Sequence, residues 1–519
     1  MNLRRQILGL SLVLSASASL MAQTAPKAAP AAGNAYEINV GIKDYTGNKV
    51  VLAFQLGEKT YVKDTVDFVN GKATFKGAEE LPGGLYMVLM PPDNKFFQML
   101  VSKGEQKMTF ETSGPDYVGN MKLKGSKDNQ AFYDYMNFLS GMNKKATPIR
   151  AQVEASKNKP ESAEYKAAQD GMKAMDDEVK AYQKNMVTTN PNYLSSKIVQ
   201  SNMALDIPQP KKADGVTLDT VAQFKWYKKH FFDGFDWADE RMVRTDILQK
   251  KMMTWVGNLA VQHPDSICVA VDYIMESARK NKEVFKYCAS ELLNYYAATK
   301  VICMDAVYVY IADKYYCSPN APYGAFWVEK EQLAKICDNA AELRGVRCNQ
   351  VAPDLVLTNL EGKPVRLSEV KSPITVVYFW DPDCGNCKKM SERMVALWDE
   401  LKFYGVEVYG ICSKGGEDYP KCAKKVEDMK MPWINTGDPG VYALARAKQA
   451  YDIKMTPYMY MLDKDKKIIY KHIDGDQLRD IARREFEKGK KNPPKFPNPL
   501  PPLPPSDDKT HGTEAPGVH

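Results

Sequence analysis

Two cysteines separated by two residues, Cys384 and Cys387, are the residues of this sequence best suited to carry out chemistry. A cysteine thiolate is a nucleophile, and a thiol three positions further on can reach back and close a disulfide ring with the first. Such a pair can cycle between a dithiol and a disulfide. Because the chain has ten cysteines, a pair at this spacing can also arise by accident, so its sequence context decides the interpretation.

The flanking residues place this pair at the junction between a strand and a helix. Residues 374–379 are an apolar run typical of a buried strand, and a short polar stretch leads from it to Cys384. Beyond Cys387, apolar residues recur at helical spacing, namely Met390, Met394, Leu397, Trp398 and Leu401. Cys384 is therefore expected at a helix N-terminus, where unpaired N–H groups and the helix dipole stabilise a thiolate.

A second segment of interest is the step Thr456–Pro457. It precedes a predicted strand at residues 458–462, which a turn connects to another at 468–470. A proline that opens such a strand is a candidate for a cis peptide bond, which would leave the backbone of Thr456 free to pair with an extended substrate. The alternative is an ordinary trans proline at a strand edge.

From Ala352 to about Glu487 the sequence resembles the thioredoxin fold, most of all the exported thiol–disulfide oxidoreductases of bacterial envelopes. The matching pieces are Ala352–Leu355, Asn359–Val365, Leu367–Ser368, Phe379–Trp380, the Cys384/Cys387 pair, Thr456–Pro457 and the hairpin after it. The residues before this region resemble, more loosely, uncharacterised extensions found on such modules.

The resemblance implies a role for each matched residue. Cys384 would be the attacking thiol, Cys387 the resolving thiol and Pro457 the cis-proline beside them, with Thr456, Pro457 and Trp380 contacting the substrate. It also implies protein thiols and disulfides as substrates and an unidentified electron donor or acceptor in the envelope. No cofactor beyond the redox-active disulfide, and no metal, is expected.

Two positions depart from the thioredoxin pattern. Tyr378 stands where thioredoxin has a buried aspartate, six residues before the first cysteine, and Asp383 directly precedes Cys384. A carboxylate at this position opposes thiolate formation, whereas Lys388 and Lys389 favour it. The sequence therefore leaves the reduction potential and the direction of electron flow open.

Three other functions are considered for the same residues. A thiol peroxidase would follow a Pro-x-x-x-Thr-x-x-Cys pattern, but Val377 and Asp381 occupy the proline and threonine positions. A zinc site would need two further ligands, and the chain has no second Cys-x-x-Cys pair. The third alternative is a binding or scaffolding protein with a non-catalytic thioredoxin-like domain, because some 300 residues before the pair have no assigned role.

The remaining cysteines leave their pairing open. Cys412 and Cys422 belong to the same region as the pair and could bridge each other, relay electrons or pack in the core. Six more precede it: Cys268, Cys288, Cys303, Cys317, Cys337 and Cys348. Six thiols allow 15 pairings, among which a sequence cannot choose.

The whole chain is predicted to be a multidomain α+β protein. Residues 1–22 have the basic start, apolar stretch and small residues of a signal peptide, and 23–35 form a linker. Short alternating segments predict a small β-sandwich at 36–125, with a two-residue hairpin at Asn70–Gly71. Helical spacing predicts a helical domain at 126–345, then a thioredoxin-like α/β domain at 346–487 and a proline-rich disordered tail at 488–519.

Within the helical part, two patterns have alternative interpretations. Apolar residues of 172–186, three of them methionines, step by three and four, which favours a packing seam over a copper site. Residues 231–237 are rich in aromatic and acidic side chains, which fits either a ligand site or an aromatic corner of the core.

Composition narrows the class of protein further. A formal charge of +7 over 519 residues, with acids and bases mixed, argues against nucleic-acid binding. No run of about 18 apolar residues follows the first 22, so no integral membrane span is expected. The predicted leader points to export, with the periplasm as the expected location and association with the outer envelope left open.

Overall fold

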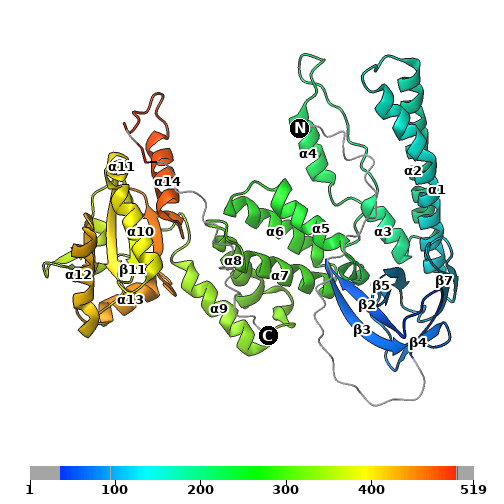
Figure 1. Cartoon of the computed structure of the whole chain (residues 1–519), viewed down its shortest axis with the longest axis horizontal. Helices are drawn as coiled ribbons and strands as arrows, with labels where there is room; N and C mark the ends of the chain where they lie inside the picture. Colours follow the sequence, from blue (N-terminus) through cyan, green and yellow to red (C-terminus); the bar gives the residue numbers. More distant parts are fainter. Residues whose placement is uncertain (1–34, 94, 498, 501–519) are drawn as a thin grey trace. The chain divides into compact units, whose positions relative to one another are not determined.

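The computed structural model describes residues 35–93, 95–497 and 499–500 (Figure 1). The predicted signal peptide, nearly all of the linker and most of the proline-rich tail lie outside these residues. The described chain forms two compact units. The first holds the residues up to 262 together with 269–290, and the second holds 263–268 and the residues from 291 onwards.

The first unit begins with the predicted β-sandwich. Two four-stranded sheets have the orders β4-β1-β7-β8 and β3-β2-β5-β6. Along β1 buried residues alternate with more exposed ones, as expected of a strand with one face in the core. The strands are β1 Tyr36–Lys43, β2 Lys49–Leu56, β3 Lys59–Asp67, β4 Lys72–Gly77, β5 Gly84–Met90, β6 Lys95–Val101, β7 Lys107–Ser113 and β8 Lys122–Lys124.

The turn at Asn70–Gly71 differs from the predicted hairpin. Both residues have positive φ, 53° and 76°, and Val69 and Lys72 exchange backbone hydrogen bonds of 2.9 and 3.0 Å. However, β3 and β4 belong to different sheets, so the chain passes from one sheet to the other at this turn. The reason is that β4 pairs with β1 along its length, which buries Phe75 in the core.

Helices follow the sandwich, as predicted. They are α1 Lys127–Ser156, α2 Ala163–Thr189, α3 Leu194–Asn202, α4 Thr220–His230, α5 Ile247–Thr254, α6 Pro264–Ala278, α7 Lys282–Ala297, α8 Asp305–Ala312 and α9 Lys330–Arg344. Helix α1 starts on the sandwich, because the buried side chain of Asn129 bonds both the N–H and the carbonyl of Leu100 at 2.7 Å.

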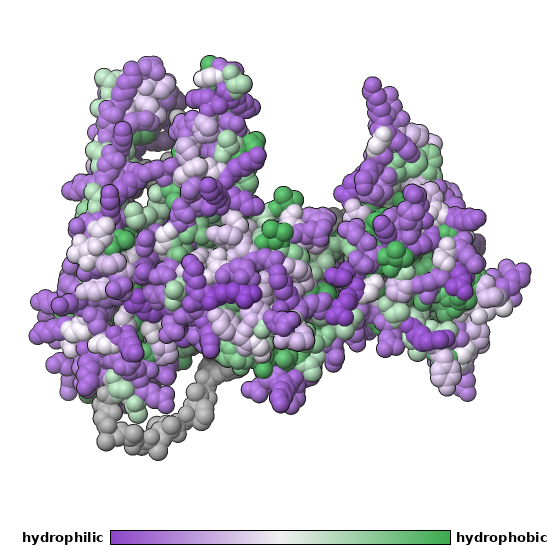
Figure 2. Space-filling view, turned by 180° about the vertical axis from the view of Figure 1, so that it is seen from behind, coloured by the Kyte–Doolittle hydropathy of each residue, from purple (hydrophilic) through white to green (hydrophobic). Residues whose placement is uncertain are grey.

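The two long helices α1 and α2 lie side by side (Figure 1). Their contact buries Tyr135 and Met186, with Leu139 and Tyr182 packed against them. Of the predicted seam, Met186 and Tyr182 belong to this cluster, whereas Met172, Met175 and Val179 are only partly buried. The aromatic segment 231–237 is also part of the core, since Phe231, Phe232, Phe235 and Trp237 are all buried. The face in Figure 2 is largely hydrophilic, with hydrophobic residues in scattered patches.

The second unit contains a seven-stranded sheet in the order β10-β9-β13-β12-β11-β14-β15. Its elements are β9 Val356–Asn359, β10 Pro364–Arg366, β11 Ile374–Trp380, α10 Gly385–Ala396, α11 Trp398–Phe403, β12 Val406–Cys412, α12 Tyr419–Met429, β13 Ile434–Gly437, α13 Tyr442–Ala450, β14 Tyr458–Leu462, β15 Ile468–Lys471 and α14 Gly475–Glu487. Strands β11, β12 and β13 are parallel, and β14 runs antiparallel to β11. This is the predicted thioredoxin-like α/β fold.

Strand β11 is buried along its whole length and contributes side chains to two hydrophobic clusters, one on each face of the sheet. Its residues 374, 376, 378 and 380 face a cluster that includes residues of α10, α11, α12 and α14. Residues 377 and 379 face a cluster with α13 and the segment before the sheet. Helices on both faces explain why the strand reads as a continuous apolar run rather than an alternating one.

Two disulfides lie in the part of the second unit that precedes the sheet. They join Cys303 to Cys348 and Cys317 to Cys337. The first links the segment before α8 to the segment before the sheet. The predicted boundary at 345/346 therefore falls inside the second compact unit. Among the described residues, no helix combines the length and apolar character needed to cross a bilayer.

Candidate active site

The fold places Cys384 at the start of a helix, as the sequence predicted. Strand β11 ends at Trp380, a short turn follows, and Cys384 is the N-cap of α10. The turn is fixed by Asp381, whose carboxylate accepts the N–H of Asp383 at 2.8 Å and whose carbonyl accepts that of Cys384 at 3.2 Å. A thiol at this position faces the unpaired N–H groups of the first helical turn.

The two thiols differ in burial. The N–H of Cys387 donates to the Sγ atom of Cys384 at 3.2 Å, so the Cys384 sulfur is a hydrogen-bond acceptor. Cys387 is 1% exposed, whereas Cys384 is only partly buried. Burial, together with the side-chain hydrogen bond that Cys387 makes to Cys384, raises the pKa of the Cys387 thiol to about 12. Cys387 therefore stays protonated near neutral pH.

Tyr378 occupies the position of the thioredoxin aspartate and contacts the same helix. Its hydroxyl lies 3.2 Å from the carbonyl oxygen of Cys387 and 3.0 Å from the hydroxyl of Ser391. Burial raises the pKa of this phenol well above its usual value, so it is neutral over the whole working range of pH. The site thus replaces a buried acid with a neutral group that fixes the first turn of α10.

The peptide bond between Thr456 and Pro457 is cis, as predicted. The carbonyl oxygen of Thr456 lies 3.6 Å from the Sγ atom of Cys384, so the structure brings this loop and the thiol pair together. Trp380 differs from the prediction. Its side chain is 1% exposed and packs in the core behind the pair, because β11 is buried up to its last residue. It supports the site from within and offers no surface to a substrate.

Two lysines outside the sequence prediction, Lys414 and Lys421, lie against the acidic turn. The Nζ atom of Lys414 lies 3.4 Å from a carboxylate oxygen of Asp381 and 3.2 Å from one of Asp383. Lys421 lies 4.0 Å from Asp383. By contrast Lys388, which was expected to favour the Cys384 thiolate, is exposed, and its Nζ atom lies 3.8 Å from a carboxylate oxygen of Glu392.

The sequence contained one signal for these lysines. Both lie between Cys412 and Cys422, which are ten positions apart and form a disulfide. The parallel pairing of β11 and β12 sets Trp380 opposite Cys412, so the segments after both strands meet at one edge of the sheet. A bridge between Cys412 and Cys422 was one of the open alternatives, and it is the one that the structure shows.

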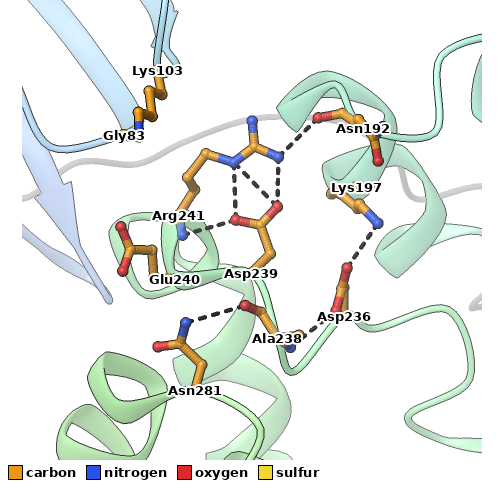
Figure 3. A pocket seen from close by; sticks show the side chains of 10 residues that line it. All are labelled: Gly83, Lys103, Asn192, Lys197, Asp236, Ala238, Asp239, Glu240, Arg241 and Asn281. Atoms are coloured by element: carbon orange, nitrogen blue, oxygen red, sulfur yellow. Dashed lines mark hydrogen bonds and ion pairs between the residues drawn. The ribbon is translucent and has the colours of Figure 1, made fainter.

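A separate cavity of about 470 Å³ lies in the first unit (Figure 3). Four of its charged side chains form two pairs: Lys197 lies 2.7 Å from Asp236, and Arg241 lies 2.6 Å from Asp239 while donating to the carbonyl of Asn192 at 2.9 Å. The first pair ties α3 to residue 236, and the bond to Asn192 ties Arg241 to the segment before α3. Within the described ranges, no group of three or more His, Cys, Asp or Glu is arranged to hold a metal ion.

Comparison with known families divides the chain into three matched stretches. Residues 36–132 match a domain of unknown function, DUF4369, and residues 183–344 match another, DUF5106. Residues 348–471 match the AhpC/TSA family. The last stretch contains the thiol pair and the cis-proline.

Curated relatives resemble the same C-terminal part. The thiol-disulfide oxidoreductase ResA of Bacillus cereus is 27% identical over 166 residues, which cover 32% of this chain and 84% of that protein. The chloroplastic peroxiredoxin Q of Sedum lineare is 34% identical over 89 residues, covering 17% of this chain and 46% of that protein.

Among solved structures, a thioredoxin-like protein from Bacteroides caccae is similar to this chain. It is 16% identical with a TM-score of 0.40, covering 54% of this chain and 99% of that one. The thioredoxin domain of a thiol-disulfide oxidoreductase from Bacteroides vulgatus is 23% identical with a TM-score of 0.25, covering 26% of this chain and 96% of that domain.

The fold and the site define a thioredoxin-like domain with a Cys-x-x-Cys pair at a helix start. Residues 348–471 match the AhpC/TSA family and are similar to thiol–disulfide oxidoreductases, and two stretches that match domains of unknown function precede them.

Proposed function

We propose that this protein is an exported thiol–disulfide oxidoreductase that acts on protein disulfides through Cys384 and Cys387. The observation that carries the proposal is the difference between the two thiols. Cys384 is partly open at the start of α10 and accepts the N–H of Cys387, whereas Cys387 is buried with its pKa raised to about 12. In the proposed reaction Cys384 attacks the substrate, and Cys387 stays protonated until it resolves the mixed disulfide.

The reaction follows from these positions. The thiolate of Cys384 attacks one sulfur of a substrate disulfide, and the other substrate sulfur leaves as a thiolate. Cys387 then loses its proton and attacks the Sγ atom of Cys384, which releases the second substrate thiol. The substrate gains two electrons, the protein ends as a Cys384–Cys387 disulfide, and an envelope dithiol has to reduce it again. The same steps run in reverse for an oxidase, and neither direction needs a cofactor beyond the two sulfurs.

Thr456 and Pro457 form the proposed substrate-contacting loop. The carbonyl of Thr456 lies beside the attacking sulfur, and the neighbouring Met455 is 64% exposed. An extended peptide that carries the target disulfide would lie against this loop. The proposed location is the periplasm, which fits the predicted leader and disulfides such as Cys317–Cys337 that persist in oxidising compartments.

A trapping experiment tests the proposal. A Cys387→Ser variant should retain envelope proteins as mixed disulfides through Cys384, and dithiothreitol should release them. The double variant Cys384→Ser/Cys387→Ser is the matched control and should retain none. If the single variant traps nothing while a known oxidoreductase does so in the same cells, the proposal fails and the scaffolding function takes its place.

Thiol peroxidase activity is the second candidate, because the family match and the peroxiredoxin relative favour it. It makes a separate prediction. Reduced protein would consume hydrogen peroxide at a rate well above that of free cysteine, with Cys384 oxidised first to a sulfenic acid. A rate no higher than that of free cysteine would remove this candidate and leave disulfide exchange untouched.

A further inference from the structure

The attacking thiol has an unfavourable neighbourhood in sequence. Asp383 directly precedes Cys384, and Asp381 lies three positions before it. The side chain of Asp381 accepts the N–H of Asp383, so the turn that leads to Cys384 carries two carboxylates within three residues of it. An unneutralised carboxylate near a thiol disfavours the thiolate and so slows its attack.

Lys414 lies against both of these carboxylates. Its Nζ atom is 3.4 Å from Asp381 and 3.2 Å from Asp383, and its side chain is 27% exposed. The hydrogen bond to Asp383 and the charge of Asp381 raise the pKa of Lys414, so the lysine is fully charged at neutral pH. Lys421 adds a weaker contact at 4.0 Å to Asp383, since it is also 2.8 Å from Asp418.

The other charged groups on the surrounding elements do not replace this contact. On α10, Lys388 lies near Glu392 and Lys389 is exposed. On α13, Lys448 donates to the carbonyl of Ser413 at 3.0 Å and feels the charge of Asp381, but forms no ion pair with it. On the loop before Pro457, Lys454 lies 2.8 Å from Glu342. Tyr378 on β11 and Cys387 on α10 are neutral, so Lys414 is the cation in contact with both carboxylates.

The fold fixes the segment that carries Lys414. The N–H of Ser413 donates to the carbonyl of Trp380 at 2.7 Å, which continues the pairing of β11 with β12. On the other side, the N–H of Gly416 donates to the carbonyl of Gly440 at 3.0 Å. A Cβ atom at Gly415 would lie 2.2 Å from that same carbonyl oxygen, so only glycine permits this approach.

The buried Cys412–Cys422 disulfide closes the same segment. Cys412 precedes Lys414 by two residues and Cys422 follows Lys421 directly, so the bridge holds both lysines at the sheet edge. Both cysteines are 1% exposed and belong to the core cluster that contains Trp380 and Cys387. This burial explains why the bridge is not placed to exchange with a large substrate.

We propose that Lys414, held by the Cys412–Cys422 bridge, is a positioning residue for the redox reaction: it neutralises Asp381 and Asp383 so that Cys384 reacts as a thiolate. Lys414 does not touch the substrate and acts only through these two carboxylates. The bridge is structural and remains oxidised while the Cys384–Cys387 pair cycles. The inference deepens the proposed function, on which it rests.

The test measures the rate at which iodoacetamide alkylates Cys384 between pH 5 and 10. The full-length protein carries Cys387→Ser so that the attacking thiol is measured alone, and mass spectrometry identifies the alkylated peptide. Lys414→Gln should raise the midpoint of the pH profile by about half a unit and lower the rate at pH 6 about threefold. Lys414→Arg should restore the normal midpoint, and 1 M salt should reduce the shift.

Matched variants separate the charge effect from damage to the fold. Lys424→Gln removes an exposed lysine from the same helix as Lys421 and should leave the midpoint unchanged. Asp383→Asn should lower the midpoint, and Asp383→Asn/Lys414→Gln should return it close to normal. Cys412→Ala/Cys422→Ala should raise it, whereas Cys317→Ala/Cys337→Ala should not.

Two outcomes overturn the inference. One is a Lys414→Gln midpoint equal to that of Lys424→Gln, and the other is an Asp383→Asn midpoint that does not fall. Failure of the proposed function is seen separately, because the alkylation profile needs no substrate. If the wild-type pair never equilibrates with glutathione, the oxidoreductase proposal fails even where Lys414 shifts the profile.

Discussion

Cys384 and Cys387 lie in one helical turn, yet the fold gives them different surroundings. The side chain of Cys387 points into the core around β11, where desolvation disfavours its thiolate. Cys384 caps the helix and remains partly accessible. The sequence predicted the helix start at Cys384, because the apolar spacing locates it. It could not predict Lys414, whose proximity depends on the pairing of β11 with β12.

The buried thiol makes the stability of the reduced protein depend on pH. The pKa of Cys387 is raised from 9.0 to about 12 in the folded protein, so folding favours the protonated form. Its contribution is fully present below about pH 9 and is lost as the pH rises toward about 12, because the unfolded chain releases the proton first.

Urea unfolding of the reduced protein from pH 8 to 11 checks this dependence. The free energy of unfolding should fall more steeply above pH 9 for the wild type than for Cys387→Ser, which has no thiol to titrate at this position. Parallel decreases in the two proteins would contradict the assignment, since other groups would then account for the whole change.

Tyr378→Phe tests the replacement of the thioredoxin aspartate. The substitution removes the hydroxyl that contacts Ser391 and the carbonyl of Cys387. These two buried groups then lose a hydrogen-bond partner. The free energy of unfolding should fall by about 1 kcal/mol. Tyr442→Phe is the control, because Tyr442 is 82% exposed and its loss of a hydroxyl should change stability by less than about 0.5 kcal/mol. Equal effects of the two changes would mean that the Tyr378 hydroxyl contributes nothing.

At the scale of elements, the order of strands and helices in the C-terminal part followed from sequence. Apolar runs located the central strands, and the proline at 457 marked the start of β14. The turn at Asn70–Gly71 shows where such reasoning ends. Its residue types define the local turn correctly, but the partner of each strand depends on which sheet buries Phe75, and that is a property of the tertiary packing.

Strand β15 carries a buried lysine whose loss should destabilise the second unit. Lys471 is 5% exposed, and its Nζ atom lies 2.6 Å from a carboxylate oxygen of Asp305 and 2.9 Å from the carbonyl of Val346. Lys471→Met should lower the free energy of unfolding by about 3 kcal/mol, because it leaves the Asp305 carboxylate without its counter-ion.

A second substitution distinguishes a lost ion pair from poor packing. Lys471→Met/Asp305→Leu should recover a substantial part of the lost stability, because no unpaired charge remains. Urea midpoints of the three proteins give the comparison. If the double variant is no more stable than Lys471→Met alone, the cost comes from packing around residue 471 and not from the carboxylate.

At the scale of the whole chain, length and residue patterns predicted several domains of mixed class, and the predicted boundary at 345/346 lies between the stretches that match DUF5106 and the AhpC/TSA family. A change from helical to strand-like spacing near residue 345 suggested a boundary there. The second compact unit nevertheless includes α8 and α9. The contacts responsible connect residues far apart in sequence, such as Cys303 with Cys348 and Glu342 with Lys454. Spacing patterns within one segment carry no information about such contacts.

Two fragments of the chain test where the folding unit begins. A fragment of residues 346–500 lacks Cys303 and Asp305, so Cys348 has no disulfide partner and the buried Lys471 has no counter-ion. A fragment of residues 300–500 retains both contacts. The shorter fragment should therefore be less stable to urea by about 2 kcal/mol or more, because it lacks the Cys303–Cys348 disulfide. The double variant Cys303→Ser/Cys348→Ser of the longer fragment keeps the Lys471–Asp305 ion pair. It therefore measures the contribution of the disulfide alone to the free energy of unfolding. Equal urea midpoints for the two fragments would instead place the start of the folding unit at residue 346. In that case α8 and α9 would not contribute to the stability of the thioredoxin-like domain.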